Sequence, residues 1–207
     1  MATRGRPPLL SNETILDAAL AAFATNGYAA TSVRALNASL GLSHEAITQR
    51  FGAKPDLFRA AVAHGFEMFI VEFDEEVSAP DASDDLGQLR AIVRAFIIAT
   101  SHHPTLGELL HREEFSSEDR EALVTSVGMI ERMATVAALL DRLHSQGLIE
   151  ETPLRQLWFL AQSGAAQLHF PGVAGMFDPF DGPVDRDQTI ESMTDAIMRS
   201  MGVTGGR

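Results

Sequence analysis

Apolar residues recur every three or four positions along most of the chain, and this spacing predicts helices. The first such stretch covers residues 13–27 and ends at Asn26-Gly27, a helix-stop signal. Its apolar face consists of Ile15, Ala19, Ala22 and Phe23. No stretch shows the period-two alternation typical of a half-buried strand. We therefore expect an all-α protein.

The same pattern predicts a series of further helices. Thr31 or Ser32 caps a second helix that Gly41 ends, and Ser43 caps a third of about two turns. Pro55 suits the first turn of a fourth helix that continues to about residue 77. The remaining helices are expected at residues 86–102, 104–115, 117–146, 153–170 and 186–201, with loops at 79–85 and 171–185.

The tight turn Gly41-Leu42-Ser43 between two short helices predicts a helix-turn-helix. Its inward side chains are Leu36, Leu40, Ile47 and Phe51, which leaves His44, Glu45, Thr48 and Gln49 on the outer face of the third helix. Glutamine can form a paired bond to adenine, and a threonine methyl can pack on a thymine methyl. The alternative is an ordinary corner between two helices, which is common in helical proteins.

Two basic features accompany this turn. Lys54, the only lysine, lies where the fourth helix begins, and its charge opposes the helix dipole there. A DNA phosphate would satisfy both the lysine and the free N–H groups; the alternative is an exposed lysine whose cost is tolerated. Arg4 and Arg6 form a basic arm suited to a narrow minor groove, or else an incidental tail.

Charge divides the chain into two parts. The net charge is −12, yet residues 1–60 hold six cations against four acids, and residues 61–207 hold ten against 24. A mildly basic head on an acidic body is compatible with nucleic-acid binding by the head alone. The chain has no cysteine, which excludes disulfides and thiolate chemistry. Neither a secretory signal nor a stretch of about 20 apolar residues is found, so we expect a cytoplasmic protein.

Residues 13–62 resemble the DNA-binding head of the TetR family of bacterial transcriptional regulators. The resemblance depends on the Ile15-Leu16 opening with Ala18-Ala19, Phe23, Gly27-Tyr28, Thr31-Ser32-Val33, Gly41-Leu42-Ser43, Phe51, Lys54 and Leu57. Three positions depart from the family's usual residues, namely Asn37 for alanine, Glu45 for glycine and Thr48 for tyrosine. The missing tyrosine and the added negative charge do not change the expected fold. They do leave the operator sequence undetermined.

The resemblance implies the roles of several residues. The expected DNA contacts are Arg4, Arg6, Thr31, Ser32, Arg34, Ser43, His44, Glu45, Thr48, Gln49 and Lys54. The implied organisation is a basic arm at 1–10, a DNA-binding domain at 11–53, a ligand-binding and dimerisation domain at 54–202, and a tail at 203–207.

The resemblance also implies a homodimer on a palindromic operator, built from the last two long helices. The candidate dimer residues are Leu157, Ala161, Ala165, Leu168, Ile190, Met193 and Ile197. Periodicity alone equally permits these stripes to be ordinary core within one chain. A dimer would match half-sites about 34–36 Å apart on one face of DNA.

Aromatic and methionine residues of the body could line a cavity for a small, mainly hydrophobic ligand. The apolar candidates are Phe66, Phe69, Phe73, Phe96, Met129, Met133 and Trp158, and the polar candidates are His102, His111 and Gln162. Most of them would be core in either case. By analogy with the family, ligand binding would move the fourth helix and release the DNA, so we expect a repressor without a cofactor or catalytic residue.

A metal-dependent helical enzyme is the alternative. Glu108 and His111 form a Glu-x-x-His pattern, and Asp141 and His144 form a weaker counterpart. Helical bundles can hold two metals with such pairs and two further glutamates, for which Glu67 and Glu72 are candidates. Exposed charged faces explain these residues more simply, so no metal site is expected.

Overall fold

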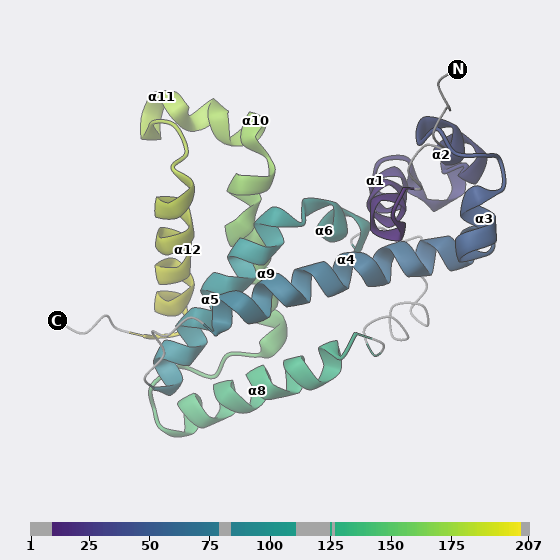
Figure 1. Cartoon of the computed structure of the whole chain (residues 1–207). Coiled ribbons are helices and arrows are strands. Elements are labelled where there is room, and N and C mark those ends of the chain that lie inside the picture. Colours follow the sequence, from purple (N-terminus) through teal and green to yellow (C-terminus); the bar gives the residue numbers. More distant parts are fainter. Residues whose placement is uncertain (1–9, 79–83, 111–124, 126, 204–207) are drawn as a thin grey trace, which may run out of the picture. The chain divides into compact units, whose positions relative to one another are not determined.

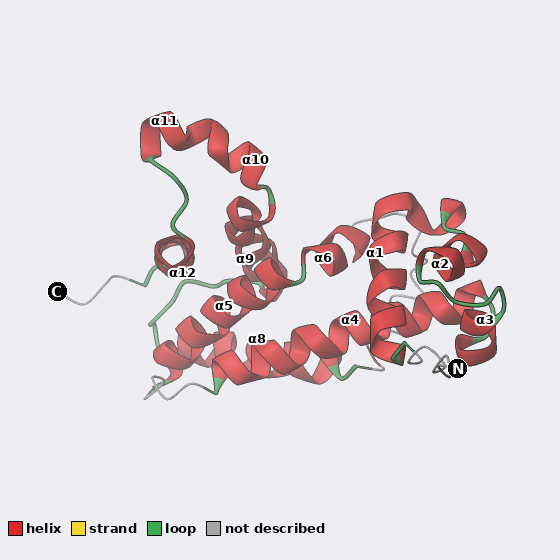
Figure 2. Cartoon of the chain, turned by 45° about the horizontal axis from the view of Figure 1, so that its top comes forward, coloured by secondary structure: helices red, strands yellow, loops and turns green. Residues whose placement is uncertain are grey.

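The structure is a computed structural model that describes residues 10–78, 84–110, 125 and 127–203. Within these residues every regular element is a helix (Figure 2), which confirms the expected all-α class. None of the helices in the described ranges combines the length and hydropathy needed to cross a bilayer. The elements, traced in Figure 1, are α1 (Asn12–Ala30), α2 (Val33–Ser39), α3 (Ala46–Phe51), α4 (Lys54–Val77), α5 (Asp85–His102), α6 (Pro104–Leu110), α8 (Met129–Ser145), α9 (Leu154–His169), α10 (Pro171–Ala174), the 3-10 helix η1 (Gly175–Phe177), α11 (Asp178–Asp181) and α12 (Arg186–Ser200).

The chain divides into two compact units. The first comprises Met1–Phe66 with Thr105–Leu123, and the second comprises Glu67–Pro104 with Val124–Arg207. The division falls within α4, so this helix contributes residues to both units. The functional bounds expected at 11–53 and 54–202 stay predictions.

The core of the first unit forms around α1. Ser11 caps this helix, because its hydroxyl accepts a hydrogen bond from the Thr14 amide at 3.1 Å. Gly27 takes φ 80°, so helical geometry breaks at the predicted stop before the chain adds one turn to Ala30. The side chains that are fully removed from solvent here include Ile15, Ala19, Phe23, Ile47, Leu57 and Val62. This small core joins the helix-turn-helix to its supporting helices.

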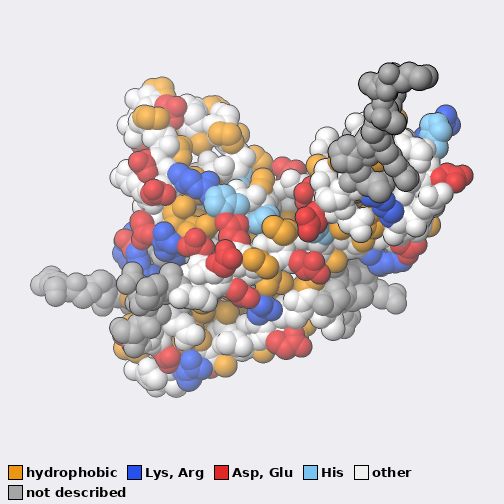
Figure 3. All heavy atoms as spheres, viewed as in Figure 1, with side chains coloured by type: hydrophobic (Ala, Val, Ile, Leu, Met, Phe, Trp, Pro, Cys, Tyr) orange, Lys and Arg blue, Asp and Glu red, His pale blue; other side chains and the backbone are white. Residues whose placement is uncertain are grey.

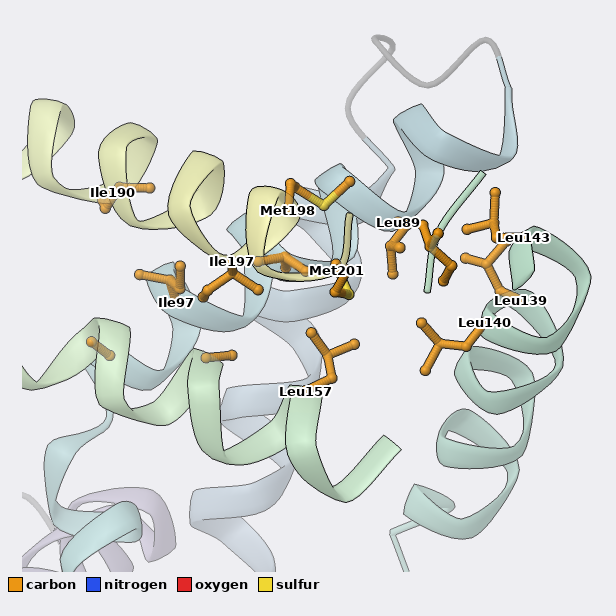
Figure 4. Close-up of a cluster of buried hydrophobic side chains, with 14 of the residues drawn as sticks. Leu89, Ile97, Leu139, Leu140, Leu143, Leu157, Ile190, Ile197, Met198 and Met201 are labelled. Atoms are coloured by element: carbon orange, nitrogen blue, oxygen red, sulfur yellow. The ribbon is translucent and has the colours of Figure 1, made fainter. Parts of the chain in front are cut away.

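The second unit has its own core, drawn in Figure 4. Helices α5, α9 and α12 pack against one another, and α8 packs on α5 and α9. The best-buried side chains come from all four helices and include Leu89, Ile97, Leu139, Leu143, Leu157, Ile197 and Met201. Burying a side chain of this size contributes about 1.5–3 kcal/mol, so this cluster supplies much of the stability of the unit.

Two expected segments differ from the structure. Within the described residues, the helix predicted at 117–146 is interrupted at Gly128, whose left-handed φ of 67° precedes the start of α8 at Met129. Residues 117–124 and 126 of that prediction lie outside the described residues. The loop predicted at 171–185 instead contains α10, η1 and α11. Pro171 opens α10, where proline costs no hydrogen bond, and that preference outweighs the loop-like composition of the segment.

Candidate nucleic-acid interface and ligand cavity

Helices α2 and α3 form the predicted helix-turn-helix. Ser32 caps α2, since its hydroxyl accepts from the Ala35 amide at 3.3 Å. Gly41 adopts φ 66°, the left-handed conformation expected at the end of a helix. The Leu42 amide then donates to the Asn37 carbonyl at 2.8 Å. The turn therefore closes tightly enough to bring α3 back onto α2.

The start of α3 differs from the prediction. The helix begins at Ala46, and its N-cap residue is Glu45, whose side chain makes no cap hydrogen bond. The Ser43 carbonyl instead accepts from the Ala46 amide at 3.1 Å, which forms a turn ahead of the helix. The prediction that Ser43 caps this helix is therefore wrong. Ser43 is exposed, so its predicted DNA contact stays a prediction.

One side of α3 is buried and the other is open to solvent. Ile47 has no exposed area, while His44, Glu45, Thr48 and Gln49 are exposed. The Gln49 amide nitrogen donates to a Glu45 carboxylate oxygen at 3.3 Å. This weak bond has to be exchanged before Gln49 can read an adenine edge. The polar face is available to a duplex, and its DNA contacts stay predictions.

The charge of Lys54 does not lie against the start of its own helix, because the side chain extends to the end of α1. Its ammonium group donates to the Ala29 carbonyl at 3.1 Å and lies 4.7 Å from the centre of the Tyr28 ring. Ala29 belongs to the end of α1, where the dipole favours positive charge. An Asp56 carboxylate oxygen accepts from the Ala53 amide at 3.1 Å, so a group of the chain itself already binds one donor at the start of α4. A phosphate is not needed to explain Lys54, although an ammonium group has donors left for one.

The other residues expected to contact phosphate differ in their exposure to solvent. Thr31 is only 4% exposed, and its hydroxyl donates to the Gly27 carbonyl at 2.7 Å. Ser32 and Arg34 are exposed. Of the pair Thr31 and Ser32, the structure therefore favours Ser32 as a possible contact. Arg4 and Arg6 lie outside the described residues.

Two further side chains organise this region and were missed in the sequence. Arg50 of α3 donates to the Leu10 carbonyl at 2.7 Å, next to the basic arm. Asn37 of α2 is fully buried and bonds to two backbone groups at the start of α3. The sequence did contain a sign that Asn37 is buried, because Asn37 directly follows Leu36, a residue of the inward face of α2.

The comparisons with known proteins agree with this geometry. Residues 15–61 match the family model described as bacterial regulatory proteins, tetR family. A TetR family transcriptional regulator, PfmR from Thermus thermophilus, is a solved structure similar to the chain. It shares 19% identity at a TM-score of 0.62 over 92% of this chain and 97% of its own. The resemblance to the TetR family is confirmed.

Other solved structures show the same fold. A regulatory protein of the tetR family from Rhodococcus RHA1 shares 17% identity at a TM-score of 0.66, over 94% of this chain and all (100%) of its own. AibR in complex with isovaleryl coenzyme A and operator DNA shares 18% identity at a TM-score of 0.62, over 88% of this chain and 95% of its own. Comparison with curated proteins finds no match. The chain therefore has the fold of TetR-family transcriptional regulators over nearly its whole length.

The second unit contains a cavity of about 230 Å³ between α4, α5, α8 and α9. Six of the predicted ligand residues line it, namely Phe69, Phe73, Phe96, Met129, Met133 and Trp158. The Phe96 and Trp158 rings meet edge to face with centroids 4.7 Å apart. The wall is thus largely aromatic and aliphatic, as a mainly hydrophobic ligand requires.

The other predicted ligand residues lie elsewhere. Phe66 belongs to the first unit and is buried there, and neither His102 nor Gln162 lines this cavity. His102 is exposed, and it pairs with Glu72 and contacts Arg186. His111 lies outside the described residues. Periodic spacing selected apolar wall residues well but gave no means of locating polar ones.

The polar part of the cavity wall includes an ion pair that the sequence did not suggest. Arg132 of α8 donates two hydrogen bonds to Asp74 of α4, at 2.5 Å and 3.4 Å. Both residues line the cavity, together with Gln88 and Thr135. Because the two charges cancel, the pair presents no net charge to a ligand.

The predicted dimer residues pack largely within one chain. Leu157, Ala161, Ala165, Ile190 and Ile197 are buried in the core of the second unit, and Leu168 and Met193 pack against it. The structure thus supports the alternative that periodicity left open for these stripes. Exposed apolar side chains occur instead on α9 and on the segment between α9 and α12. We call this the apolar surface; it comprises Phe159, Phe170, Val173, Met176, Phe177, Phe180 and Val184. Figure 3 shows hydrophobic side chains at the surface over the segment of α10 and α11.

His111 of the metal-site alternative lies outside the described residues, and its other carboxylate and histidine residues do not gather. Within the described part of the chain, no group of three or more such residues could hold a metal ion. Glu108 lies in the first unit, and Asp141 and His144 lie on α8 in the second. His144 donates from its ring to the Ile149 carbonyl at 3.3 Å. The described residues thus give the metal-site alternative no support.

Proposed function

We propose that the chain is a homodimeric repressor that binds a palindromic operator through α3 and leaves it when a hydrophobic ligand binds. We further propose a cytoplasmic location and no catalytic step. The observation that carries the proposal is the exposed polar face of α3, set on buried Ile47 within a TetR-type head. The similar protein AibR, solved with isovaleryl coenzyme A and operator DNA, supports a chain that binds both DNA and a small molecule.

The proposed ligand is neutral or nearly so, with a compact apolar body. The cavity is small and has mostly apolar walls, and its one arginine is already paired with Asp74. Phe69 and Phe73 of α4 line this cavity, and the same helix begins at Lys54. A ligand that binds better to one position of α4 would change DNA affinity by that difference in binding.

The proposed dimer uses the apolar surface. Phe180 is 84% exposed and Met176 is 70% exposed, which is unusual for such large apolar side chains. Seven such side chains, each offering roughly 100 Å², give about 700 Å², close to the ~800 Å² that one partner contributes to a standard interface. A groove of about 460 Å³ is lined in part by Phe170, Val173, Phe177 and Val184, and it could receive Met176 and Phe180 of a second copy. We therefore assign the dimer contact to this surface.

The dimer is tested by sedimentation of the full chain. The double variant Phe180→Ser, Met176→Ser should dissociate at least about 30-fold more readily than wild type, as truncation of interface anchors does. Val71→Ser is the matched control, because Val71 is 54% exposed and lies outside the apolar surface. A double variant that sediments as wild type would exclude this surface.

DNA binding is tested by selecting bound duplexes from a random pool with the wild-type protein. We expect palindromes with half-sites about 34–36 Å apart to be enriched. Hydrophobic compounds are then screened for release of the selected duplex. A pool that stays random after selection would contradict the proposed function.

A further inference from the structure

Asn37 is a polar residue whose side chain is buried in the protein interior. It lies on α2 with no exposed area. Its amide nitrogen donates to the His44 carbonyl at 3.0 Å, and its amide oxygen accepts from the Ile47 amide at 3.2 Å. Only this orientation of the amide satisfies both groups, because the reverse would set oxygen against oxygen and N–H against N–H. Asn37 is thus bonded on both sides to the segment that starts α3.

Helix α3 lacks a cap of its own. Ser11 and Ser32 cap α1 and α2 with their own hydroxyls. Glu45, the N-cap residue of α3, has φ −110° and ψ −3°, whereas residues that cap with their own side chain usually adopt an extended conformation. A cap oxygen normally binds the amide of the second or third residue of its helix, and Ile47 is the second residue of α3. The oxygen of Asn37 therefore occupies the place of the missing cap.

We infer that Asn37 caps α3 from α2 and so positions the recognition face on the operator. The inference rests on the proposed function, in which α3 reads DNA. Helix α3 has only six residues, and so short a helix has little stability of its own. Its height and rotation are set by the buried Ile47 side chain and by the two bonds of Asn37. His44, Thr48 and Gln49 are carried by the same backbone, so they move whenever this anchor is lost.

The resemblance to the TetR family sharpens the inference. Alanine is the usual residue at the position of Asn37, and an alanine side chain can form neither bond. Thr48 likewise replaces a usual tyrosine on the exposed face of α3. The side chain at position 48, which is expected to contact DNA, is therefore shorter, and the segment that starts α3 has two additional hydrogen bonds to α2. Asn37 is a positioning residue that the usual DNA-binding head of the family does not contain.

The test compares Asn37→Ala with wild type in the full chain, on the duplex selected from the random pool and on a random duplex. We expect the dissociation constant of the selected duplex to rise about tenfold, because both bonds are lost, while that of random DNA changes less than about twofold. Hydrogen exchange at the Ile47 amide should accelerate about tenfold, and exchange at Phe23 should not change. A purely structural role would instead weaken both duplexes together.

Asn26→Ala is the matched control. Asn26 also donates its amide to a carbonyl, that of Ala22 at 3.0 Å, but it is exposed and bonds within α1. It should leave both dissociation constants and the Ile47 exchange rate unchanged. Wild-type discrimination together with wild-type Ile47 exchange in Asn37→Ala would overturn the inference.

Asn37→Asp decides the matter if Asn37→Ala does not fold. It retains the volume and the acceptor for Ile47 but sets an oxygen against the His44 carbonyl. Discrimination should fall while Ile47 exchange stays close to wild type, and unchanged discrimination would count against a positioning role. If wild type enriched no DNA at all, the proposed function would fail, whereas Ile47 exchange would still establish or exclude the cap.

Discussion

The two units use their cations differently. In the first unit, Arg50 donates to the carbonyl of Leu10 at 2.7 Å, and Lys54 donates to the carbonyl of Ala29 at 3.1 Å. In the second unit, Arg90, Arg94, Arg132 and Arg142 pair with carboxylates, whereas Arg186 donates to the Ser101 hydroxyl. Arg59 of the first unit, paired with Asp56, follows the pattern of the second.

A carbonyl bond and a carboxylate bond differ in what they leave behind. A carbonyl fixes the position of a cation but leaves its full charge, whereas a carboxylate cancels it. The first unit thus holds positive charges in fixed places that can still attract phosphate. In the acidic second unit the same residue types join helices to one another. The placement of partners, more than the number of cations, separates a DNA-binding surface from a structural one.

The arginines of α5 show the second use most clearly. Arg94 bonds to Glu191 of α12 at 2.7 Å and to Glu76 of α4 at 2.9 Å. The hydrogen bond to Glu191 contributes most to the raised pKa of Arg94. Burial by itself would lower the pKa of Arg90, but Asp195 and Glu191 outweigh it and raise the pKa. Both guanidinium groups stay charged wherever the protein is folded, so these links do not respond to pH through arginine.

The largest expected effect concerns Gln49, which is proposed to recognise a base and not to attract the phosphate backbone. Gln49→Ala should cost about 1–3 kcal/mol at one base-pair position of the selected operator and little at the others, because a paired bond to one base is lost. The salt dependence of binding should not change. Competition binding against single-base variants of the operator measures this. Gln156→Ala on α9, an exposed glutamine of the second unit, is the control. Equal weakening on every sequence would show that Gln49 contacts the backbone.

Lys54 should have a smaller and uniform effect. Lys54→Ala should weaken binding to every duplex several-fold and reduce the salt slope by about one per subunit, because one phosphate contact is lost. Titrations at a series of salt concentrations check this, with Lys54→Arg retaining the slope. An unchanged slope would show that the bond to Ala29 and the contact with Tyr28 are the whole role of Lys54.

The head was predictable because its signals are local. Ser32, Gly41 and the spacing of Leu36 and Ile47 determine caps, a left-handed turn and a buried face within a few residues of one another. The start of α3 was predicted wrongly because its cap comes from Asn37, ten residues earlier and on another helix. Sequence spacing describes bonds within a helix and not bonds between helices.

The body was less predictable because one pattern fits several environments. Phe69 and Leu157 both follow helical spacing and both line the cavity, yet Leu157 is also part of the core and was expected in a dimer. The Asp74–Arg132 pair joins residues 58 positions apart, which no local rule relates. The segment that carries Phe180 has the composition of a loop, yet Phe180 lies in helix α11. Choosing between core, cavity and interface required the positions of neighbouring helices.

The cavity pair should have a modest effect on ligand preference. Asp74→Asn leaves Arg132 without its carboxylate, so a medium-chain fatty acid should gain affinity several-fold over the matching alcohol. The gain is limited because Arg132 is 37% exposed and water screens the charge. Calorimetry with the acid and the alcohol measures the ratio, and Asp85→Asn, outside the cavity, is the control. A ratio equal to that of wild type would mean that the ligand's polar end does not approach Arg132.

The smallest effect is expected for Arg142, and it tests the comparison most directly. Arg142 is a half-exposed cation like those of the head, but it pairs with Asp85 at 3.2 Å and 3.4 Å. Arg142→Ala should change the free energy of unfolding by less than about 0.5 kcal/mol, because exposed pairs contribute little. It should leave DNA affinity and the salt slope at their wild-type values, whereas Arg50→Ala should reduce both. If Arg142→Ala lowered the slope as much as Arg50→Ala does, pairing with a carboxylate would not separate structural cations from those that attract DNA.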